Sequence, residues 1–444
     1  MRPFWTFLHR WVGLSTAVFL FLTGVTGAVI SWDHELDAWL NPHLTAAQPN
    51  PEGLPSISTL ELARQIEQRH PMVTVRFIPL HVEPGRSVAF GVAPRVNPAT
   101  QKLHEPGFNQ VFVDPVSGQE LGQRQWGAVW PISRETFVSF LYKFHHTLHL
   151  PEMWGIDRWG TWLLGGVAIL WTLDCFVGAY LTLPVRRKVK PQPGNGLVGD
   201  EVVALKTGKG WWQLWAPAWK IRSRAGAYKL NFDMHRAVSL WTWGLLFIVA
   251  FTAFSLNLNR EIFRPLLTTF SQVSPNPFTQ RKPAPKHQPI LPVLDYAQAL
   301  AQATADAQAK GWPEPPGSVF YSQSLGIYGI DFFQPDTTPG SVNKRLYYDG
   351  RDGRFVGERL LWTGSVADIF LQAQFPLHSG RILGLPGRIL ISLLGVVVAM
   401  LSVTGVYIWW KKRRARWAVV RRSAATPEPR QTSRPAGSDD IWVK

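Results

Sequence analysis

The chain has 444 residues, a net charge of +16, 22 Trp and one Cys. One cysteine excludes an intramolecular disulfide and a thiolate cluster, and the absence of Cys-x-x-Cys-His excludes covalent c-type haem attachment. A basic chain of this kind can bind nucleic acid, but its positive charge gathers in the segments flanking long uncharged runs. We therefore predict a membrane protein and no nucleic-acid partner.

Four apolar runs reach the length of about 20 residues that a helix needs to cross a bilayer core. They are Trp11–Trp32, Trp159–Leu183 with its lone Asp174, Ala237–Leu258 and Ile389–Trp410. The first run lacks a small-x-small cleavage site, so we expect an uncleaved signal anchor rather than a removed signal peptide.

Lysine and arginine concentrate in the cytoplasmic flanks of membrane spans. Residues 184–235 hold ten Lys or Arg against three acidic residues, and residues 411–444 hold the same numbers. Residues 33–140 hold eight against eleven, and residues 258–384 hold twelve against ten. We therefore expect both termini and the middle loop in the cytoplasm, two external segments, and contact of the basic segments with membrane lipid.

The order of elements indicates an internal duplication. His9-Arg10 and His235-Arg236, 226 residues apart, precede the first and third runs, and His145 and His378, 233 residues apart, precede the second and fourth. Each external segment then reads as a helix, two strands and a closing hairpin with a Gly-containing turn. These elements are Ser58–His70, Val73–Leu80, Ser87–Ala93 and Val111–Gly122, and again Leu294–Lys310, Ser318–Ser322, Gly326–Phe333 and Leu346–Gly357.

The predicted fold is a membrane all-α four-helix bundle with two small external α+β domains. The expected units are the N-terminus with span one (1–32), the first external domain (33–140), span two (141–183), the cytoplasmic loop (184–235), span three (236–258), the second external domain (259–371), span four (372–410) and a basic tail (411–444). The Pro/Ser/Arg-rich stretch Thr426–Ser438 is predicted to be disordered.

Histidines at the ends of the spans are the main candidates for function, because polar groups at these positions are costly. His9 and His235 lie at the cytoplasmic ends, and His378 lies at the outer end with the cluster His145, His146 and His149. Neutral imidazoles from facing helices can hold haem iron from both sides. A Zn or Cu site is the weaker alternative, because no cysteine or suitably spaced carboxylate within a span completes a four-ligand shell.

The outer cluster leaves the choice of ligand open. His145 and His149 share a helix face, whereas His146 points about 100° away. The duplication aligns His145 with His378, so His145 is favoured, with His149 and then His146 as alternatives.

Charged and small residues surround these histidines. Arg10, Arg236 and Arg381 lie near them and suit either haem propionates or lipid headgroups, and Asp233 is expected to fix its loop or cap a helix. Glycines in spans two and four would let helices or a macrocycle approach closely; they are Gly165, Gly166, Gly178, Gly395 and Gly405.

Four motifs together resemble the PepSY-associated transmembrane family. His9–Leu14 (HRWVGL) is similar to the opening of that family, and Asp233–Arg236 (DMHR) to the segment before its third span. Phe112–Gly122 is similar to the end of a PepSY domain, and Leu377–Arg388 to the segment leading into the last span. The resemblance covers nearly the whole chain up to about Trp417.

The resemblance implies more than the residues alone. It implies two PepSY-like periplasmic domains in a bacterial inner-membrane protein with two haem b groups, held by His9 with His235 and by His145 with His378. Relatives of this kind reduce ferric siderophores on the periplasmic side, so an oxidoreductase acting on a ferric siderophore or another ferric chelate is expected. The fused flavin domain of some relatives is not expected here, so the donor is expected to be quinol or a separate cytoplasmic reductant.

Two other functions remain open. A membrane anchor whose external domains bind peptides or regulate a protease would leave the span-end histidines without a role. A transporter for the iron complex would need polar residues in broken helices at mid-membrane, and Asp174 is the only acidic residue within a run.

Overall fold

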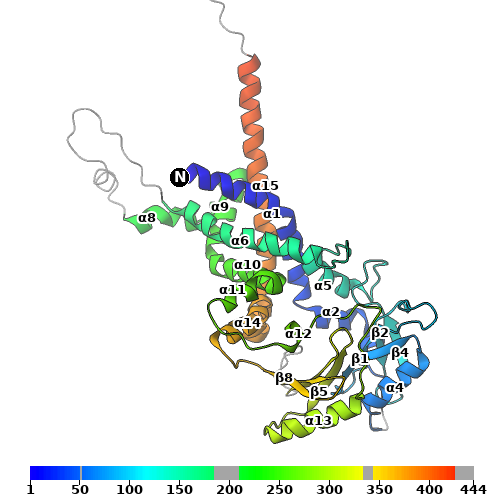
Figure 1. The fold of residues 1–444 in the computed structure, drawn as a ribbon. Coiled ribbons are helices and arrows are strands. Elements are labelled where there is room, and N and C mark those ends of the chain that lie inside the picture. The colour runs from blue at the N-terminus through cyan, green and yellow to red at the C-terminus, as the bar shows by residue number, and fades with distance from the viewer. Residues whose placement is uncertain (51–52, 185–209, 334–343, 426–444) are drawn as a thin grey trace, which may run out of the picture.

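The computed structural model describes residues 1–50, 53–184, 210–333 and 344–425. A group of long helices forms one end of the molecule and a β-sheet with its helices forms the other, as Figure 1 shows. The predicted disordered stretch Thr426–Ser438 and residues 185–209 of the middle loop lie outside the described residues.

Three of the described helices are long and apolar enough to cross a membrane. They are α1 (Arg2–Ile30), α6 (Trp159–Thr182) and α15 (Gly384–Ala425). Each covers most or all of its predicted run. The helix α1 begins before Trp11 and ends at Ile30, α6 ends at Thr182, and α15 continues past Trp410. In Figure 1, α1 and α15 lie side by side, and α15 extends beyond the start of α1.

The third predicted span is bent. It consists of α9 (Ala227–Trp241) and α10 (Trp243–Asn257), which meet at an angle of 74°. The break falls at Thr242, next to Trp243, whose indole donates a hydrogen bond of 2.9 Å to the Cys175 carbonyl of α6. The 15 residues of α10 span only about 22 Å, so a straight span at Ala237–Leu258 is wrong.

The strands of both halves form one antiparallel sheet in the order β4-β3-β2-β1-β5-β6-β7-β8. Its strands are β1 (Val73–Pro79), β2 (Val88–Pro94), β3 (Gln110–Val113), β4 (Glu120–Arg124), β5 (Pro316–Ser322), β6 (Ile327–Phe332), β7 (Lys344–Asp349) and β8 (Phe355–Leu360). The halves meet where β1 pairs with β5, with Phe77 opposite Phe320 and Ile78 opposite Val319. We call this pairing the seam.

One hydrophobic core lies beneath β1, β2, β3, β5, β6 and β7. The helices α4 (Thr59–Arg69) and α13 (Tyr296–Ala309) pack against it, and both were predicted. Alanines at every fourth position of α13 let this helix approach the strands closely, and the hydroxyl of Tyr296 donates 2.8 Å to the Val75 carbonyl of the other half.

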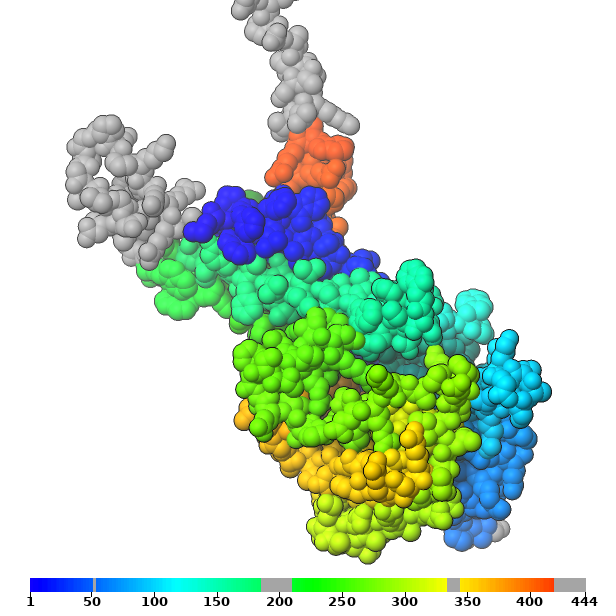
Figure 2. Space-filling view, viewed as in Figure 1, coloured from blue at the N-terminus to red at the C-terminus, as the bar shows by residue number. Residues whose placement is uncertain are grey.

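The prediction of an all-α four-helix bundle with two separate small domains is therefore wrong. The predicted strands exist, but a lone half would expose the backbone N–H and C=O groups of β1 or β5 as a free edge, which is a liability. Pairing at the seam satisfies both edges and merges the two expected domains into one unit. Figure 2 shows this sheet unit in contact with the helices above it.

The remaining helices are shorter. They are α2 (Asp33–Leu40), α3 (Pro42–Thr45), α5 (Phe137–Thr147), α8 (Trp211–Trp215), η1 (Ala216–Trp219), η2 (Asn259–Phe263), α11 (Arg264–Thr268), α12 (Pro277–Gln280), α14 (Val366–His378) and η3 (Arg381–Leu383). Among these, α5 and α14 occupy equivalent places in the two halves, because each follows the last strand of its half and carries a candidate histidine in its last turn.

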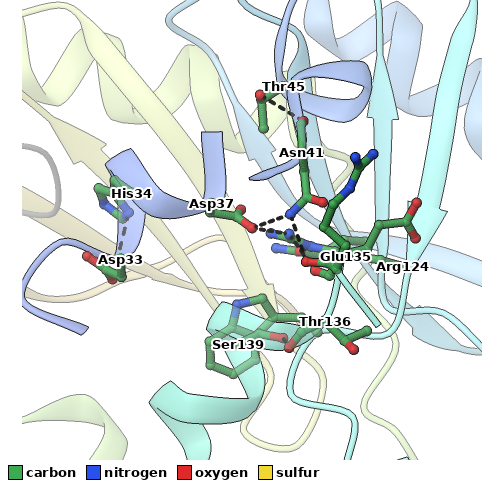
Figure 3. Close-up of polar contacts among 12 residues, drawn as sticks. Asp33, His34, Asp37, Asn41, Thr45, Arg124, Glu135, Thr136 and Ser139 are labelled. Carbon is green, nitrogen blue, oxygen red and sulfur yellow. Dashed lines mark hydrogen bonds and ion pairs between the residues drawn. The ribbon is translucent and has the colours of Figure 1, made fainter. Parts of the chain in front are cut away.

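A buried polar network fastens α2 and the start of α5 to the sheet (Figure 3). Arg124 of β4 donates 2.7 Å to the Asp37 carboxylate of α2 and 3.2 Å to the Glu135 carbonyl. Asn41 donates 2.9 Å to the same Asp37 oxygen. The guanidinium of Arg124 is nearly fully buried, so losing its partner would leave an uncompensated charge. The network therefore holds the segment that leads into α5 against the sheet.

The closing hairpins of the halves share one turn design. One carboxylate oxygen of Asp114 accepts the Val116 and Ser117 N–H groups, and one oxygen of Asp349 accepts the Arg351 N–H. The other oxygen takes a donor from the segment that precedes its domain: the backbone N–H of Gln48, or the guanidinium of Arg281, respectively. The predicted turns are confirmed.

Candidate functional site

His145 and His378 face each other at the sheet end of the membrane helices. His145 is near the end of α5 and His378 ends α14, and their ring centroids lie 6.3 Å apart. Both rings line a cavity of about 290 Å³, here called the sheet-side cavity, together with residues of α1, α6, α10 and α15. The two equivalent helices of the halves thus deliver one histidine each to the same space.

His9 and His235 face each other at the opposite end of the helices. His9 lies on α1 and His235 on α9, and their ring centroids are also 6.3 Å apart. They line a larger cavity of about 470 Å³, here called the tail-side cavity, with residues of α6 and α15. Both volumes are near or within the range of about 300–1,000 Å³ that is usual for ligand pockets.

The spacing of the rings fits two imidazoles on one metal. Imidazole nitrogens bind metals such as zinc at about 2.0 Å and the ring centroid lies about 1.1 Å further on, so the two centroids are expected about 6 Å apart. Both pairs have this separation.

The outer nitrogen of each ring is already occupied. His145 Nδ1 lies 3.0 Å from the Thr26 hydroxyl, and His378 Nδ1 lies 3.0 Å from the Thr252 hydroxyl. His9 Nδ1 lies 2.9 Å from Asp174, while His235 Nδ1 contacts a carbonyl and a hydroxyl of α15 (Leu401 and Thr404). Among the described residues, no hydrogen bond reaches Nε2 of any of the four. Metal-ligating histidines are held in this way by partners on the other nitrogen.

The threonine contacts fix the direction of these hydrogen bonds. The hydroxyls of Thr26, Thr252 and Thr404 donate to the carbonyl four residues earlier, at 2.8, 2.7 and 2.9 Å. Each hydroxyl oxygen is therefore left to accept the Nδ1–H of its histidine. This tautomer leaves the Nε2 lone pair free for a metal.

Glycines make room around the rings. A Cβ on Gly27 would lie 2.9 Å from His145, and Cβ atoms on Gly178 and Gly405 would lie 3.5 and 3.3 Å from His9 and His235. Gly395 meets the Gly24 backbone where α1 and α15 touch, and Gly165 meets Leu258. Nothing lies within 4 Å at Gly166, so the expected close approach does not occur there.

The alternatives within the His145 cluster lie elsewhere. His149 stacks on Phe140 with centroids 4.6 Å apart and bonds the Phe140 carbonyl through Nε2. His146 lines the sheet-side cavity, but its Nδ1 donates 2.8 Å to the Tyr142 carbonyl and its ring packs on Tyr142. His145 alone of the three is placed opposite His378.

The three candidate arginines all line the cavities. Arg10 and Arg236 line the tail-side cavity, and Arg381 lines the sheet-side cavity 3.7 Å from the Asp33 carboxylate. Arg236 Nε is buried without a hydrogen-bond partner within the described residues. An unsatisfied cationic donor in a cavity is the kind of group that a bound carboxylate, such as a haem propionate, would satisfy.

Asp233 has a structural role. Its buried carboxylate accepts the Arg222 guanidinium at 2.6 and 2.9 Å and also pairs with Arg236. Because α9 begins at Ala227, Asp233 fixes the loop, as one of the two predictions had it, and does not cap the helix.

No cluster of three or more His, Cys, Asp or Glu side chains with metal-site geometry occurs in the described part of the chain. This does not bear on the histidine pairs, since two imidazoles complete a haem iron whose other four ligands are pyrrole nitrogens.

Several contacts were not anticipated from the sequence, notably the partners of the four imidazoles. One signal was present: Thr26 and Thr252 are 226 residues apart, the same interval as His9 and His235. The partnership of Asp174 with His9 gives no such signal, because it depends on α6 packing against α1.

Together these features define a membrane protein whose helices enclose two histidine-lined cavities and carry a β-sheet unit at one end. Residues 6–412 match the family model described as the PepSY-associated TM region. The chain therefore belongs to the PepSY-associated transmembrane family, and the resemblance is confirmed. A comparison with curated proteins found no match.

Proposed function

We propose that this chain holds two b-type haems and carries electrons across a bacterial inner membrane to reduce a ferric siderophore or another ferric chelate. The observation that supports it most is the two facing histidine pairs, each with its Nδ1 atoms occupied and its rings 6.3 Å apart in a cavity.

The residues of the cavities suit this cofactor. His145 with His378, and His9 with His235, would hold iron from both sides, and the bound haem would supply one-electron transfer between the ferric and ferrous states. Arg10 and the unpartnered Nε of Arg236 suit the propionates of the tail-side group, and Arg381 suits those of the sheet-side group.

The two cavities are close neighbours. Leu20, Trp171 and Val398 line both, so one layer of side chains separates the two sites. These apolar side chains exclude water from the space between the sites, and the indole of Trp171 is the aromatic group in that layer. A short, dry path of this kind favours electron transfer from one end of the bundle to the other.

The direction of transfer follows from the charge pattern. The tail side carries Lys411–Arg414, which favours the cytoplasm, so the sheet would face the periplasm. One electron from quinol or a cytoplasmic reductant would convert one chelated Fe(III) to Fe(II). The lower charge weakens the attraction of the ion to oxygen ligands, so the iron would be released.

The first test is to purify the protein in detergent and to count haem per chain from oxidised and dithionite-reduced spectra. We expect two b-type haems. His378→Ala or His145→Ala should each remove the sheet-side haem, and His9→Ala or His235→Ala the tail-side haem. The matched control is His149→Ala, which changes a neighbouring histidine outside the cavity and should keep both haems.

The second test is reduction of a ferric hydroxamate by the reduced protein, followed with an Fe(II) indicator. The wild type should transfer one electron per iron, and His378→Ala should lose this transfer. A folded, colourless protein would refute the proposal and leave the peptide-binding membrane anchor as the better function.

A further inference from the structure

One of the four paired histidines is oriented by a charged group. Both carboxylate oxygens of Asp174 lie 2.9 Å from His9 Nδ1, and the Asp174 side chain is only 13 % exposed. Asp174 is the one charged residue of α6. Within the described residues, His9 is the one hydrogen-bond and ion-pair partner of the Asp174 side chain.

The second half of the chain has a neutral group at the position equivalent to Asp174. Gly178 packs against His9 and Gly405 packs against His235, so these glycines are equivalent positions of α6 and α15. Asp174 stands four residues before Gly178, and Leu401 stands four residues before Gly405. His235 Nδ1 lies 3.1 Å from the Leu401 backbone carbonyl, where His9 has a carboxylate.

Both imidazoles of the sheet-side cavity have neutral hydrogen-bond partners. His145 and His378 donate to the hydroxyls of Thr26 and Thr252, whose own hydrogens go to backbone carbonyls. The tail-side pair is thus the one pair, within the described residues, that has an anion behind a ligand.

A carboxylate that accepts Nδ1–H makes the imidazole a stronger electron donor at Nε2. Stronger donation and a nearby negative charge both stabilise the ferric state over the ferrous state, because the ferric state carries one more positive charge. We propose that Asp174 is a positioning residue that gives the tail-side site the lower reduction potential of the two. This inference rests on the proposed function.

The consequence is a preferred direction of electron transfer. An electron that enters at the tail-side site would pass to a site of higher potential at the sheet side. The asymmetry among the hydrogen-bond partners of the four imidazoles comes from the Asp174 side chain, since the other three imidazoles have neutral partners.

The test is a spectroelectrochemical titration of the full-length protein in detergent. The single-site variants His378→Ala and His9→Ala assign the two midpoint potentials to the tail-side and sheet-side haems. We expect the tail-side potential to be the lower one. Asp174→Asn keeps a hydrogen-bond acceptor of similar size and removes the charge, so the tail-side potential should rise by the equivalent of tenfold or more in the ratio of reduced to oxidised haem, about 59 mV for one electron.

Two variants serve as controls. Asp174→Glu keeps the charge and should shift the ratio less than Asp174→Asn does. Thr404→Val removes a neutral partner of His235 in the same cavity and should shift the ratio by less than tenfold.

Unchanged potentials in Asp174→Asn, or an equal rise at both sites, would overturn the inference. So would a wild-type tail-side potential equal to or above the sheet-side one, a result that does not depend on any Asp174 variant retaining haem. A wild-type protein without haem would instead refute the proposed function.

Discussion

The two halves of the chain orient their histidines with the same kind of hydrogen-bond partner at the sheet side and with different kinds at the tail side. At the sheet side each half uses a threonine at the same interval, Thr26 or Thr252. At the tail side the first half uses the Asp174 carboxylate, and the second half uses backbone and hydroxyl oxygens of α15. Each half thus orients its own two imidazoles, and a site forms only where the halves meet.

The largest effect, a loss of folding stability, is expected from a substitution at the seam, which joins the halves. The Gly317 carbonyl accepts the Leu80 N–H across it, and alternation along β5 places the Val319 N–H on the same side. Val319→Pro should remove that bond, at a cost of about 1–3 kcal/mol for the buried group left unpaired alone. Thermal unfolding of the sheet unit, followed by circular dichroism, should then resolve two transitions. Val319→Ala, which keeps the N–H, should unfold in one transition, and a single transition in both variants would show that the seam does not couple the halves.

The next largest effect, a loss of haem affinity, is expected from substitutions of the sheet-side threonines, which the duplication makes equivalent. Thr26→Val and Thr252→Val keep the shape of the side chain but remove the acceptor for His145 or His378. Each should weaken haem binding at the sheet-side cavity by about 10–100-fold, as measured by haem titration of the apoprotein. Effects differing by more than about tenfold would contradict the equivalence. Thr172→Val, which alters a threonine of α6 that within the described residues bonds only the Ala168 carbonyl and lines neither cavity, is the matched control.

A smaller effect, on stability and its pH dependence, is expected from substitutions of the hairpin carboxylates Asp114 and Asp349. Burial alone would raise the pKa of Asp114 and of Asp349, but the hydrogen bonds they accept outweigh it and hold both pKa values below their usual value. A lowered pKa stabilises the fold above the unfolded pKa, near 3.8, and the stability is lost as pH falls through the folded pKa.

Asp349→Asn should therefore cost about 1–2 kcal/mol at pH 7 and show a smaller loss between pH 5 and about pH 3 than the wild type, measured by urea unfolding. Asp114→Asn should behave in the same way. The control is Asp352→Asn, at a half-exposed carboxylate of the same turn. An equal pH dependence of Asp349→Asn and wild type would rule out this role.

The smallest effect is expected where α1 of the first half touches α15 of the second. A Cβ on Gly24 would lie 2.7 Å from the Gly395 carbonyl oxygen, whereas nothing lies within 4 Å at Gly13 of the same helix. Gly24→Ala should cost about 1 kcal/mol because the two helices must separate. Gly13→Ala should be neutral or stabilising by a few tenths of a kcal/mol. Equal melting temperatures for both variants would contradict the tight contact.

Sequence reasoning located the apolar runs, the hairpins and the span-end histidines, because each depends on local composition or on an interval. It could not give the seam, since nothing in the pattern of β1 or β5 specifies its neighbour. It also could not give the bend in the third span. Thr16 and Thr242 make the same bond to the carbonyl four residues earlier, at 2.9 and 2.8 Å, yet α1 is continuous at Thr16. The bend depends on the residues after Thr242 and on their packing against α6.

The seam has a further consequence for how function is distributed over the chain. In an assembly of two identical polypeptides every side chain occurs twice, so a carboxylate behind one imidazole would stand behind the other as well. Here one polypeptide supplies both partners of the β1–β5 pairing, and their association does not depend on protein concentration. One half can therefore carry Asp174 where the other half carries Leu401. A scaffold with nearly two-fold symmetry thus gains two chemically different halves.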